Sequence, residues 1–233
     1  MTPFLSIILP LHNEVDRLPD AVEKITSQRW PFEVEIIAVE NGSSDDTYEL
    51  GRFYADTVDN FYIHSIPERG KGAAVREGML KATGQWRYMA DVDFSTPVEI
   101  IYQYLNAALT LRADLVIGVR PQRAGLRAWM AGLFRLAVRP VLPGILDSQC
   151  GFKLFSGAAA DHLFNCAQLT GMAFDVELLY LARQAGYTIV QTPVPWEHNT
   201  DSRVRLVGDS LAMLADVYSI PRRHRPQMKK LPA

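Results

Sequence analysis

Two aspartates separated by one residue, Asp91 and Asp93, are the side chains of this 233-residue sequence best suited to hold a metal ion. They follow an apolar run over 86–90 that we expect to form a strand, and residues two apart on a strand share a face. Two carboxylates at the carboxyl edge of a sheet would suit Mg²⁺ or Mn²⁺ that also holds a substrate diphosphate. The alternative is that one aspartate caps the next helix while the other is solvated.

A second cluster, Arg69-Gly70-Lys71-Gly72, combines two cations with two glycines at the start of a predicted helix. Small residues let the backbone approach a phosphate, and a helix N-terminus adds positive potential. The cluster lacks the first glycine of a P-loop, because position 65 is serine, and Val75 replaces the last small residue of a dinucleotide fingerprint. Nucleoside triphosphatases and nicotinamide dehydrogenases are therefore disfavoured.

Polar residues also follow the first two predicted strands. The segment Pro10-Leu11-His12-Asn13-Glu14 ends the first, and Glu40 lies at the tip of the second. A carboxylate at such a tip commonly holds ribose hydroxyls. Each segment can also be read as an ordinary turn, with a helix cap after the second strand.

These clusters require a scaffold of alternating strands and helices. Over the first 120 residues, short apolar runs alternate with amphipathic stretches, which is typical of a parallel sheet wrapped by helices. We expect strands at 4–9, 33–39, 61–66, 86–90 and 114–119, and helices at 18–27, 46–54, 72–82 and 97–111.

The fourth of these helices should begin at position 97. Thr96, Pro97 and Glu99 supply an N-cap, an N1 proline and a capping-box acid. After 119 the pattern changes, and we read this as a change of role within one domain. The elements expected there are an amphipathic helix over 123–139, a Gly/Phe segment over 150–155, a helix over 174–185, a strand over 188–192 and a helix over 205–218.

Composition limits the class of protein. Hydrophobic residues make up 48% of the chain and charged residues 21%, which excludes disorder, collagen and coiled coil. At roughly 150 residues per domain, the length allows one large α/β domain. Cys150 and Cys166 are too few for a disulfide framework and favour a reducing, cytoplasmic setting. We expect no signal peptide, and without ~18 consecutive apolar residues the chain should lie on a membrane rather than span it.

Positive charge is concentrated in two stretches. Residues 120–144 contain five arginines and no acid, and residues 220–233 contain five more basic residues and no acid, although the formal net charge is -2. Over 123–139, apolar residues occupy one side of a helical wheel and arginines the other, which is typical of an interfacial helix. An anionic membrane surface would fit both stretches, and we expect no nucleic-acid partner. The alternatives are a helix packed on the protein's own sheet and a solvated tail.

Together, the clusters at the strand ends resemble those of the family 2 glycosyltransferases, whose GT-A fold binds a nucleotide-sugar through a divalent cation. Motifs at 118–120, 147–155, 174–179 and 202–204 narrow the resemblance to the polyprenyl-phosphate hexosyltransferases. The segments 93–97 and 194–197 favour the dolichyl-phosphate glucosyl branch.

The resemblance implies one Rossmann-like GT-A domain over 1–220, with a mostly parallel central sheet flanked by helices. Residues 1–120 would form the nucleotide-sugar half and residues 121–220 the acceptor half. Residues 221–233 would form a disordered basic tail.

Roles follow from the resemblance by position. The nucleotide-sugar would be held by Pro10, His12, Asn13, Glu14, Glu40, Arg69, Lys71 and Asp91. The metal would be bound by Asp91 and Asp93. The acceptor side would include Arg120, Asp147, Gln149, Phe174, Asp175, Glu177 and Arg203. Catalysis would depend on Asp93, Arg120 and Arg203.

Two positions depart from the family pattern. Glu40 and Asn41 stand where the family usually has two aspartates, which lengthens the expected ribose ligand. Ser95 stands where some mannosyl relatives supply a third metal ligand, so water would fill that place. Among the histidines, His198 is the one to test as a metal ligand.

The expected acceptor determines the mechanism. A lipid monophosphate with a second pKa near ~6 is largely a dianion at neutral pH, so it needs holding rather than deprotonating. Arg120 and Arg203 would hold it, because guanidinium forks match phosphate; ordinary pairing with acids is the alternative. Asp175 and Glu177 could act as base for a hydroxyl acceptor, and otherwise they are acids of an early helical turn. Attack opposite the leaving group would invert the sugar linkage.

The leading interpretation is an inverting hexosyltransferase at the cytoplasmic face of the membrane. It would move glucose, or next mannose, from a donor such as UDP-glucose to a polyprenyl or dolichyl phosphate. The alternatives are a GT-A glycosyltransferase with a soluble or other lipid acceptor, and a non-catalytic nucleotide-sugar-binding protein. A sugar nucleotidyltransferase is disfavoured, since His12-Asn13-Glu14 stands where its glycine-rich loop would follow the first strand.

Overall fold

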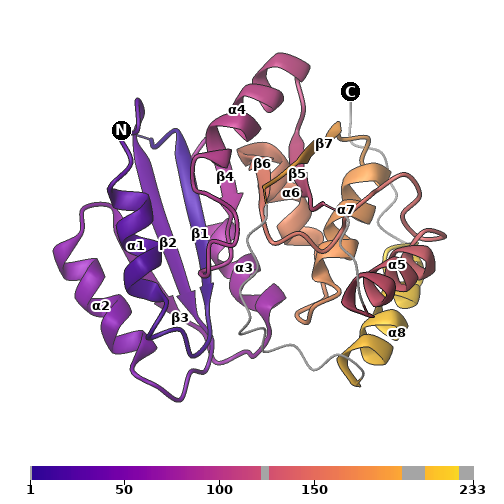
Figure 1. Ribbon diagram of the computed structural model, residues 1–233, viewed down its shortest axis with the longest axis horizontal. Coiled ribbons are helices and arrows are strands. Elements are labelled where there is room, and N and C mark those ends of the chain that lie inside the picture. Colours follow the sequence, from indigo (N-terminus) through magenta and orange to yellow (C-terminus); the bar gives the residue numbers. More distant parts are fainter. Residues whose placement is uncertain (1, 122–125, 196–207, 226–233) are drawn as a thin grey trace.

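The computed structural model describes residues 2–121, 126–195 and 208–225. These residues form a seven-stranded sheet with helices on both faces (Figure 1). The strands are β1 (Leu5–Leu11), β2 (Val34–Glu40), β3 (Phe61–Ser65), β4 (Trp86–Met89), β5 (Leu115–Val119), β6 (Lys153–Ser156) and β7 (Ile189–Pro193). The helices are α1 (Leu18–Thr26), α2 (Thr47–Thr57), α3 (Lys71–Lys81), α4 (Ile100–Leu111), α5 (Leu126–Val138), α6 (Gly157–Cys166), α7 (Phe174–Gln184) and α8 (Gly208–Arg223).

The sheet is mostly parallel, as expected from the sequence. Its strand order is β3-β2-β1-β4-β6-β5-β7, and β6 alone of these strands runs antiparallel to its neighbours, β4 and β5. The chain moves outward from β1 to β3 and then returns to place β4 on the other side of β1. In open α/β sheets this reversal is the point where ligands bind, at the carboxyl ends of the strands.

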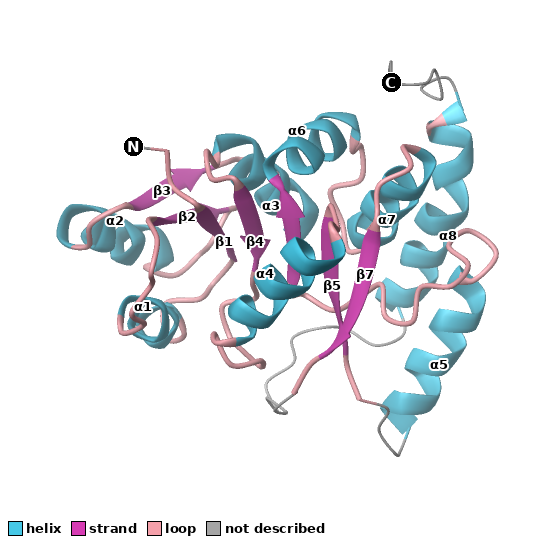
Figure 2. Ribbon diagram, turned by 90° about the horizontal axis from the view of Figure 1, so that it is seen from above, coloured by secondary structure: helices cyan, strands magenta, loops and turns pink. Residues whose placement is uncertain are grey.

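Both faces of the sheet are buried, which explains why most residues of its central strands are apolar. In β1, Ile7 packs into the core beneath α1 and α4, whereas the next residue, Ile8, packs against α3 on the opposite face. Seen from above, α1 and α4 lie on one face of the sheet, and α3, α6 and α7 lie on the other (Figure 2). The alternation of side chains along each strand therefore fixes which residues meet which layer.

The predicted elements of the first 120 residues are confirmed, with one helix start placed wrongly. Helix α4 begins at Ile100 rather than at Pro97. The Ile100 amide donates to the Pro97 carbonyl at 3.1 Å, so 97–99 form a tight turn, and Thr96 is buried with no capping bond in the described structure. The predicted capping residues therefore lie in a turn before the helix.

Three features beyond residue 119 differ from the sequence prediction. Part of the Gly/Phe segment over 150–155 is a strand, β6, and a helix that was not predicted, α6, follows it. Helix α8 continues to Arg223 instead of ending at 218, so the basic tail cannot begin at 221. Residues 226–233 lie outside the described structure.

Helices α5 and α8 lie side by side at one end of the molecule in both ribbon views (Figures 1 and 2). The Tyr218 hydroxyl of α8 donates to the carbonyl of Ala137 in α5 at 2.8 Å. No helix among the described residues is long and apolar enough to cross a membrane. Both cysteines are free thiols.

Candidate functional site

The loops after β1 and β2 meet at the carboxyl edge of the sheet, because the two strands are parallel and in register from Leu5 to Leu11. The Nδ1 atom of His12 lies 3.2 Å from the Asn41 carbonyl oxygen. The Asn13 amide donates to Ser43 Oγ at 3.0 Å. The Glu14 amide donates to the hydroxyl of Thr47, the first residue of α2, at 2.8 Å. The structure thus brings together the two polar clusters predicted as nucleotide contacts, Pro10–Glu14 and the Glu40 turn.

Glu40 is a buried carboxylate held by its own turn. It accepts hydrogen bonds from the Ser43 amide and, at 2.7 Å, from the Ser65 hydroxyl. Burial disfavours its charged form, but these hydrogen bonds outweigh burial and keep the pKa of Glu40 below its ordinary value. The carboxylate is therefore ionised and stabilises the turn through these hydrogen bonds. A role of Glu40 in ribose binding stays a prediction.

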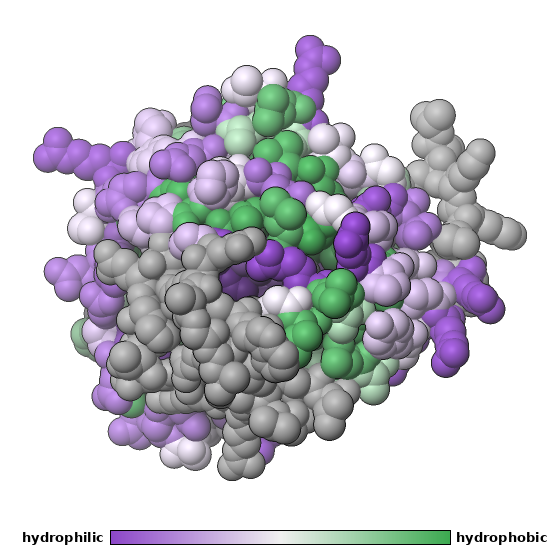
Figure 3. All heavy atoms as spheres, turned by 45° about the vertical axis from the view of Figure 1, so that its right-hand side comes forward, coloured by the Kyte–Doolittle hydropathy of each residue, from purple (hydrophilic) through white to green (hydrophobic). Residues whose placement is uncertain are grey.

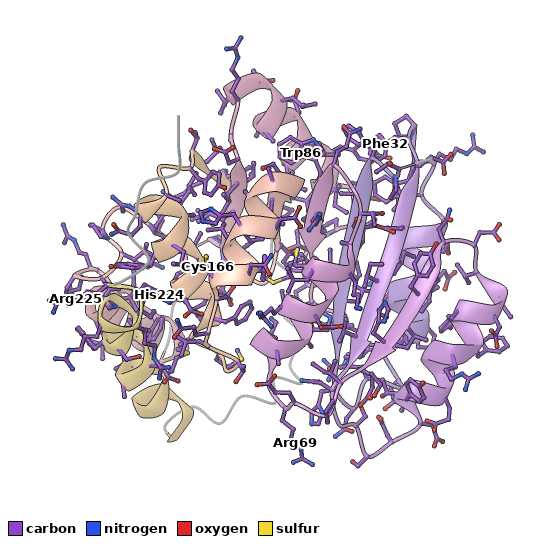
Figure 4. The ribbon with its side chains drawn as sticks, turned by 180° about the vertical axis from the view of Figure 1, so that it is seen from behind. Phe32, Arg69, Trp86, Cys166, His224 and Arg225 are labelled. Carbon is purple, nitrogen blue, oxygen red and sulfur yellow. The ribbon has the colours of Figure 1, made fainter. Side chains whose placement is uncertain are left out.

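The start of α3, where Lys71 lies between Gly70 and Gly72, is found at the same carboxyl edge of the sheet. The Asn41 side-chain amide donates to the Gly70 carbonyl at 2.8 Å, which ties the second turn to the third. Arg69 is exposed and extends from this end of the sheet, opposite the end that carries Phe32 and Trp86 (Figure 4). Lys71 is the first residue of α3, and its ammonium forms an ion pair with the carboxylate of Asp91.

The Asp91 carboxylate is enclosed by positive charge and by backbone. Burial disfavours its ionisation, but Lys71, Lys153 and Arg120 outweigh burial and lower the pKa of Asp91. A Cβ on Gly151 would lie only 2.0 Å from Asp91 Oδ2, so the backbone after Cys150 approaches the carboxylate as closely as a glycine allows. Asp91 thus has a tightly defined place beside the switch point.

Asp91 and Asp93 follow β4 in a turn rather than lying on the strand, so the predicted sharing of a strand face is wrong. Strand β4 ends at Met89, and Phe94 has a positive φ of 39°. Asp93 accepts a hydrogen bond from the Ser95 amide at 3.1 Å. The two carboxylates remain neighbours along this turn.

The donor set fits a hard divalent cation. Two carboxylates leave most positions for substrate oxygens and water, an arrangement that Mg²⁺ accepts. No group of three or more His, Cys, Asp or Glu side chains among the described residues is arranged to hold a metal by itself. Metal binding by Asp91 and Asp93 stays a proposal, and His198 lies outside the described residues.

Arg120, which follows β5, forms a fork-to-fork pair with Asp147. Its Nε lies 2.7 Å from Oδ2 and its Nη2 lies 2.9 Å from Oδ1, and its backbone amide also donates to Oδ2. Burial raises the pKa of Asp147, but Arg120 outweighs burial and lowers it. The sequence left two roles open for Arg120, phosphate binding and pairing with an acid. The structure shows the pairing with an acid, and phosphate binding stays a proposal. Arg203 lies outside the described residues.

Three more acceptor-side predictions fall at the first turn of α7 and in the loop before β6. Phe174 is buried, with its Cβ against Gly72. Asp175 is buried and lies 2.5 Å from the ammonium of Lys153. Burial raises the pKa of Asp175 despite this neighbour. The Gln149 backbone amide donates to Oδ1 of Asp147 at 3.2 Å. The Asp147 carboxylate therefore stabilises the turn that follows it.

Glu177 is also completely buried, and its carboxylate is surrounded by donors. The amides of Gln168 and Leu169 donate to it at 3.1 Å and 2.9 Å. His224 Nε2 lies 2.7 Å from its other oxygen. Glu177 therefore contacts a loop and the end of α8.

Sequence reasoning gave no individual role to three residues of this region, Gly151 and Lys153 of the 147–155 motif, and His224. Lys153 is buried, and its ammonium also contacts the Cys150 carbonyl at 2.5 Å. A lysine between Phe152 and Leu154 in an apolar run was the available signal, because lysine is almost never fully buried unless paired. No sequence signal paired His224 with Glu177, since the two residues are 47 positions apart.

Comparison with known proteins places these observations in a family context. Residues 6–158 match the family described as Glycosyl transferase family 2. Dolichyl-phosphate beta-glucosyltransferase of Homo sapiens is 32% identical over 96% of this chain and 76% of its own length. The Drosophila melanogaster enzyme of the same name is 33% identical over 93% of this chain and 74% of its own length.

Solved structures share the fold. Mannosyl-3-phosphoglycerate synthase from Rubrobacter xylanophilus superposes with a TM-score of 0.74, at 18% identity, over 99% of this chain and 77% of the other. Glucosyl-3-phosphoglycerate synthase from Mycobacterium tuberculosis, solved with Mn²⁺ and UDP-glucose, has a TM-score of 0.71 at 20% identity, over 95% of this chain and 79% of the other.

Proposed function

The chain belongs to glycosyl transferase family 2, and from this premise we propose that it transfers a hexose from a nucleoside-diphosphate sugar to a polyprenyl or dolichyl phosphate. Glucose is the favoured sugar and mannose the next. The observation that carries this proposal is the extent of the similarity, because the family match ends at residue 158 whereas the dolichyl-phosphate beta-glucosyltransferases align over as much as 96% of the chain. The similarity therefore includes the half proposed to bind the acceptor.

The donor is proposed to bind at the reversal of strand order. Pro10, His12, Asn13, Glu14 and Glu40 line the loops proposed to hold its base and ribose. Arg69 and Lys71 bring positive charge to the proposed diphosphate position, at a helix N-terminus that favours anions.

Asp91 and Asp93 would hold Mg²⁺ or Mn²⁺, and a cation bound there neutralises charge that builds on the departing diphosphate. A neighbour of the same fold was solved with Mn²⁺ and UDP-glucose, which supports a divalent cation and UDP-glucose as the first donor to test. The ion pair between Lys71 and Asp91 keeps one cationic side chain beside the proposed leaving group even before a donor binds.

The acceptor is proposed to be a phosphate dianion that needs no deprotonation. Arg120 would hold it with Arg203, and Asp147 orients the Arg120 guanidinium through two hydrogen bonds. Asp175 and Glu177 are buried and already bonded to Lys153 and His224, which leaves neither carboxylate suited to serve as a base. An acceptor that is already a nucleophile, attacking opposite the diphosphate with inversion, agrees with this arrangement.

We propose that the protein lies on the cytoplasmic face of an anionic membrane. On α5, Leu133 is 47% exposed and Leu136 is 63% exposed, and the same helical stretch carries Arg135 and Arg139. Apolar side chains reach the surface among hydrophilic ones on this side of the molecule (Figure 3). An exposed apolar strip beside arginines is the pattern of an interfacial helix.

The test is incubation with radiolabelled UDP-glucose, GDP-mannose and other donors, together with polyprenyl phosphate and Mg²⁺ or Mn²⁺. We expect an organic-extractable product from UDP-glucose that requires the metal. Free sugar in the aqueous phase would instead indicate hydrolysis of the donor, and label that moves only to an added water-soluble hydroxyl compound would indicate a soluble acceptor. Donor binding without any turnover would indicate a non-catalytic nucleotide-sugar-binding protein.

A further inference from the structure

A buried carboxylate on α7 holds a loop that packs against the proposed donor site. Glu177 accepts the amides of Gln168 and Leu169, and His224 lies 2.7 Å from its Oε1. A buried charge is stable only when donors surround it. The backbone from 168 to 170 is therefore tied to one side chain, and we call this segment the 168–170 loop.

The 168–170 loop lies directly on the first turn of α3. The Thr170 carbonyl accepts the Ala73 amide at 3.3 Å. A Cβ on Gly70 would lie 2.3 Å from that carbonyl oxygen, and one on Gly72 would lie 2.9 Å from it. The Ala73–Thr170 hydrogen bond and the approach of Thr170 to Gly70 join backbone to backbone, so a displacement of the loop would be passed on to the start of α3.

The residue between those two glycines is Lys71, the ion-pair partner of Asp91. The position of the Lys71 ammonium therefore depends on the 168–170 loop, and the loop depends on Glu177. A series of contacts therefore connects the buried carboxylate of Glu177 to the place where we propose that the leaving diphosphate binds.

His224 extends the same series to the C-terminal end of α8. Its side chain is buried, whereas the next residue, Arg225, is exposed at the periphery of the molecule (Figure 4). Tyr218 attaches α8 to α5 at a separate place, through the Ala137 carbonyl. The attachment of α8 to α7 and its attachment to α5 can thus be broken independently.

We propose that Glu177 and His224 are positioning residues for the donor, which hold Lys71 in place through the 168–170 loop and the two glycines of α3. The inference rests on the proposed function in taking Lys71 as a contact of the donor diphosphate. Neither residue touches the substrate, and Glu177 is not a general base. Through the Glu177–His224 pair, donor binding depends on the position of the C-terminal end of α8.

Amide hydrogen exchange without any donor tests the structural part of this proposal. His224→Ala removes one of the donors to Glu177, so we expect exchange at Gln168, Leu169 and Ala73 to accelerate about tenfold. His224→Gln can still donate one hydrogen bond to Glu177 and should restore most of the protection. Tyr218→Phe is the matched control, because it loosens α8 from α5 and should leave these three amides unchanged.

Binding and turnover test the functional part, with UDP-glucose and Mn²⁺ as the probe. We expect His224→Ala and Glu177→Gln to raise the UDP-glucose Kd and KM about five- to tenfold and to change kcat less than twofold. His224→Gln should return the Kd to within about twofold of wild type. Loss of a general base would give the opposite split, a kcat lower by orders of magnitude at an unchanged Kd.

The outcomes separate the two proposals. Unchanged exchange at Ala73 in His224→Ala would overturn the inference whatever the activity is, and so would a Kd equal to that of wild type. Wild-type protein that binds none of the nucleotide-sugars would overturn the proposed function, and the exchange data would still decide whether the 168–170 loop depends on His224. If Glu177→Gln does not fold, the two His224 variants give the same decision.

Discussion

Gly151→Ala tests whether the Asp91 carboxylate must stay where the fold places it. The new Cβ would lie 2.0 Å from Oδ2 and 2.5 Å from Cγ of Asp91. Gly151 is not among the residues with positive φ, so alanine suits its backbone and the clash with Asp91 is the main perturbation. Because such contacts are not sustained below 3.0 Å, Oδ2 must move from 2.0 Å to at least that distance, a shift of about 1 Å.

The size of the effect follows from this shift. Displacement of a positioned group by about 1 Å costs on the order of 100-fold in rate, or ~2.7 kcal/mol of barrier. Stability should suffer less, since Asp91 and Lys71 are both partly exposed and weakening such a pair costs at most ~1 kcal/mol. For a chain of this length that lowers Tm by about 2–4 °C. We therefore expect kcat/KM to fall far more than Tm.

The assay measures kcat/KM with UDP-glucose over a range of Mn²⁺ concentrations, together with nucleotide affinity by calorimetry and Tm. Gly132→Ala is the control for the same chemical change, because nothing lies within 4 Å of its new Cβ. It should leave donor affinity unchanged and can stabilise α5 by up to ~1 kcal/mol. A folded Gly151→Ala protein with wild-type kcat/KM and Mn²⁺ dependence would refute the placement of Asp91 in the site.

Three further predictions concern stability and membrane binding. Lys153→Met leaves Asp175 buried without its partner and should lower the free energy of unfolding by about 3–5 kcal/mol, measured by urea denaturation; adding Asp175→Leu should recover most of the loss. Arg120 keeps the pKa of Asp147 below its ordinary 3.8, so this pair stabilises the fold above that pH and its contribution is lost as pH falls below it. Asp147→Asn should therefore flatten the fall of unfolding free energy in acid, and an equally steep fall would contradict the pairing. Leu136→Glu should reduce flotation with anionic vesicles at low salt while donor affinity stays unchanged, and undiminished flotation would remove α5 from the membrane surface.

The gathering of the polar clusters at one edge of the sheet, where we propose that the donor binds, could be predicted because its information is local. Each polar cluster directly follows an apolar run, and parallel strands bring such ends to one edge whatever their order. His12, Glu40, Lys71 and Asp91 reached that edge for this reason. The geometry within the edge was less predictable, as Asp91 and Asp93 occupy a turn rather than a strand face.

The acceptor half depended on long-range pairing that no local pattern contains. Strand β6 is four residues long and pairs with β4, which lies more than sixty positions earlier in the chain. The pairs Lys153–Asp175 and Glu177–His224 form only once α7 lies near β6 and packs against α8. The start of α4 was predicted three residues too early, because residues 97–99 form a turn and Thr96 makes no capping hydrogen bond in the described structure.

The antiparallel strand β6 joins the half proposed to bind the donor and the half proposed to bind the acceptor within one sheet. It bonds to β4 on one side and to β5 on the other, so the halves cannot open and close as separate lobes about a hinge. A fragment cut at residue 120 would leave one side of β4 without a partner, and such open edges promote aggregation. A chimaera between relatives should therefore fold best with its junction after β6, because β4, β5 and β6 then come from the same parent.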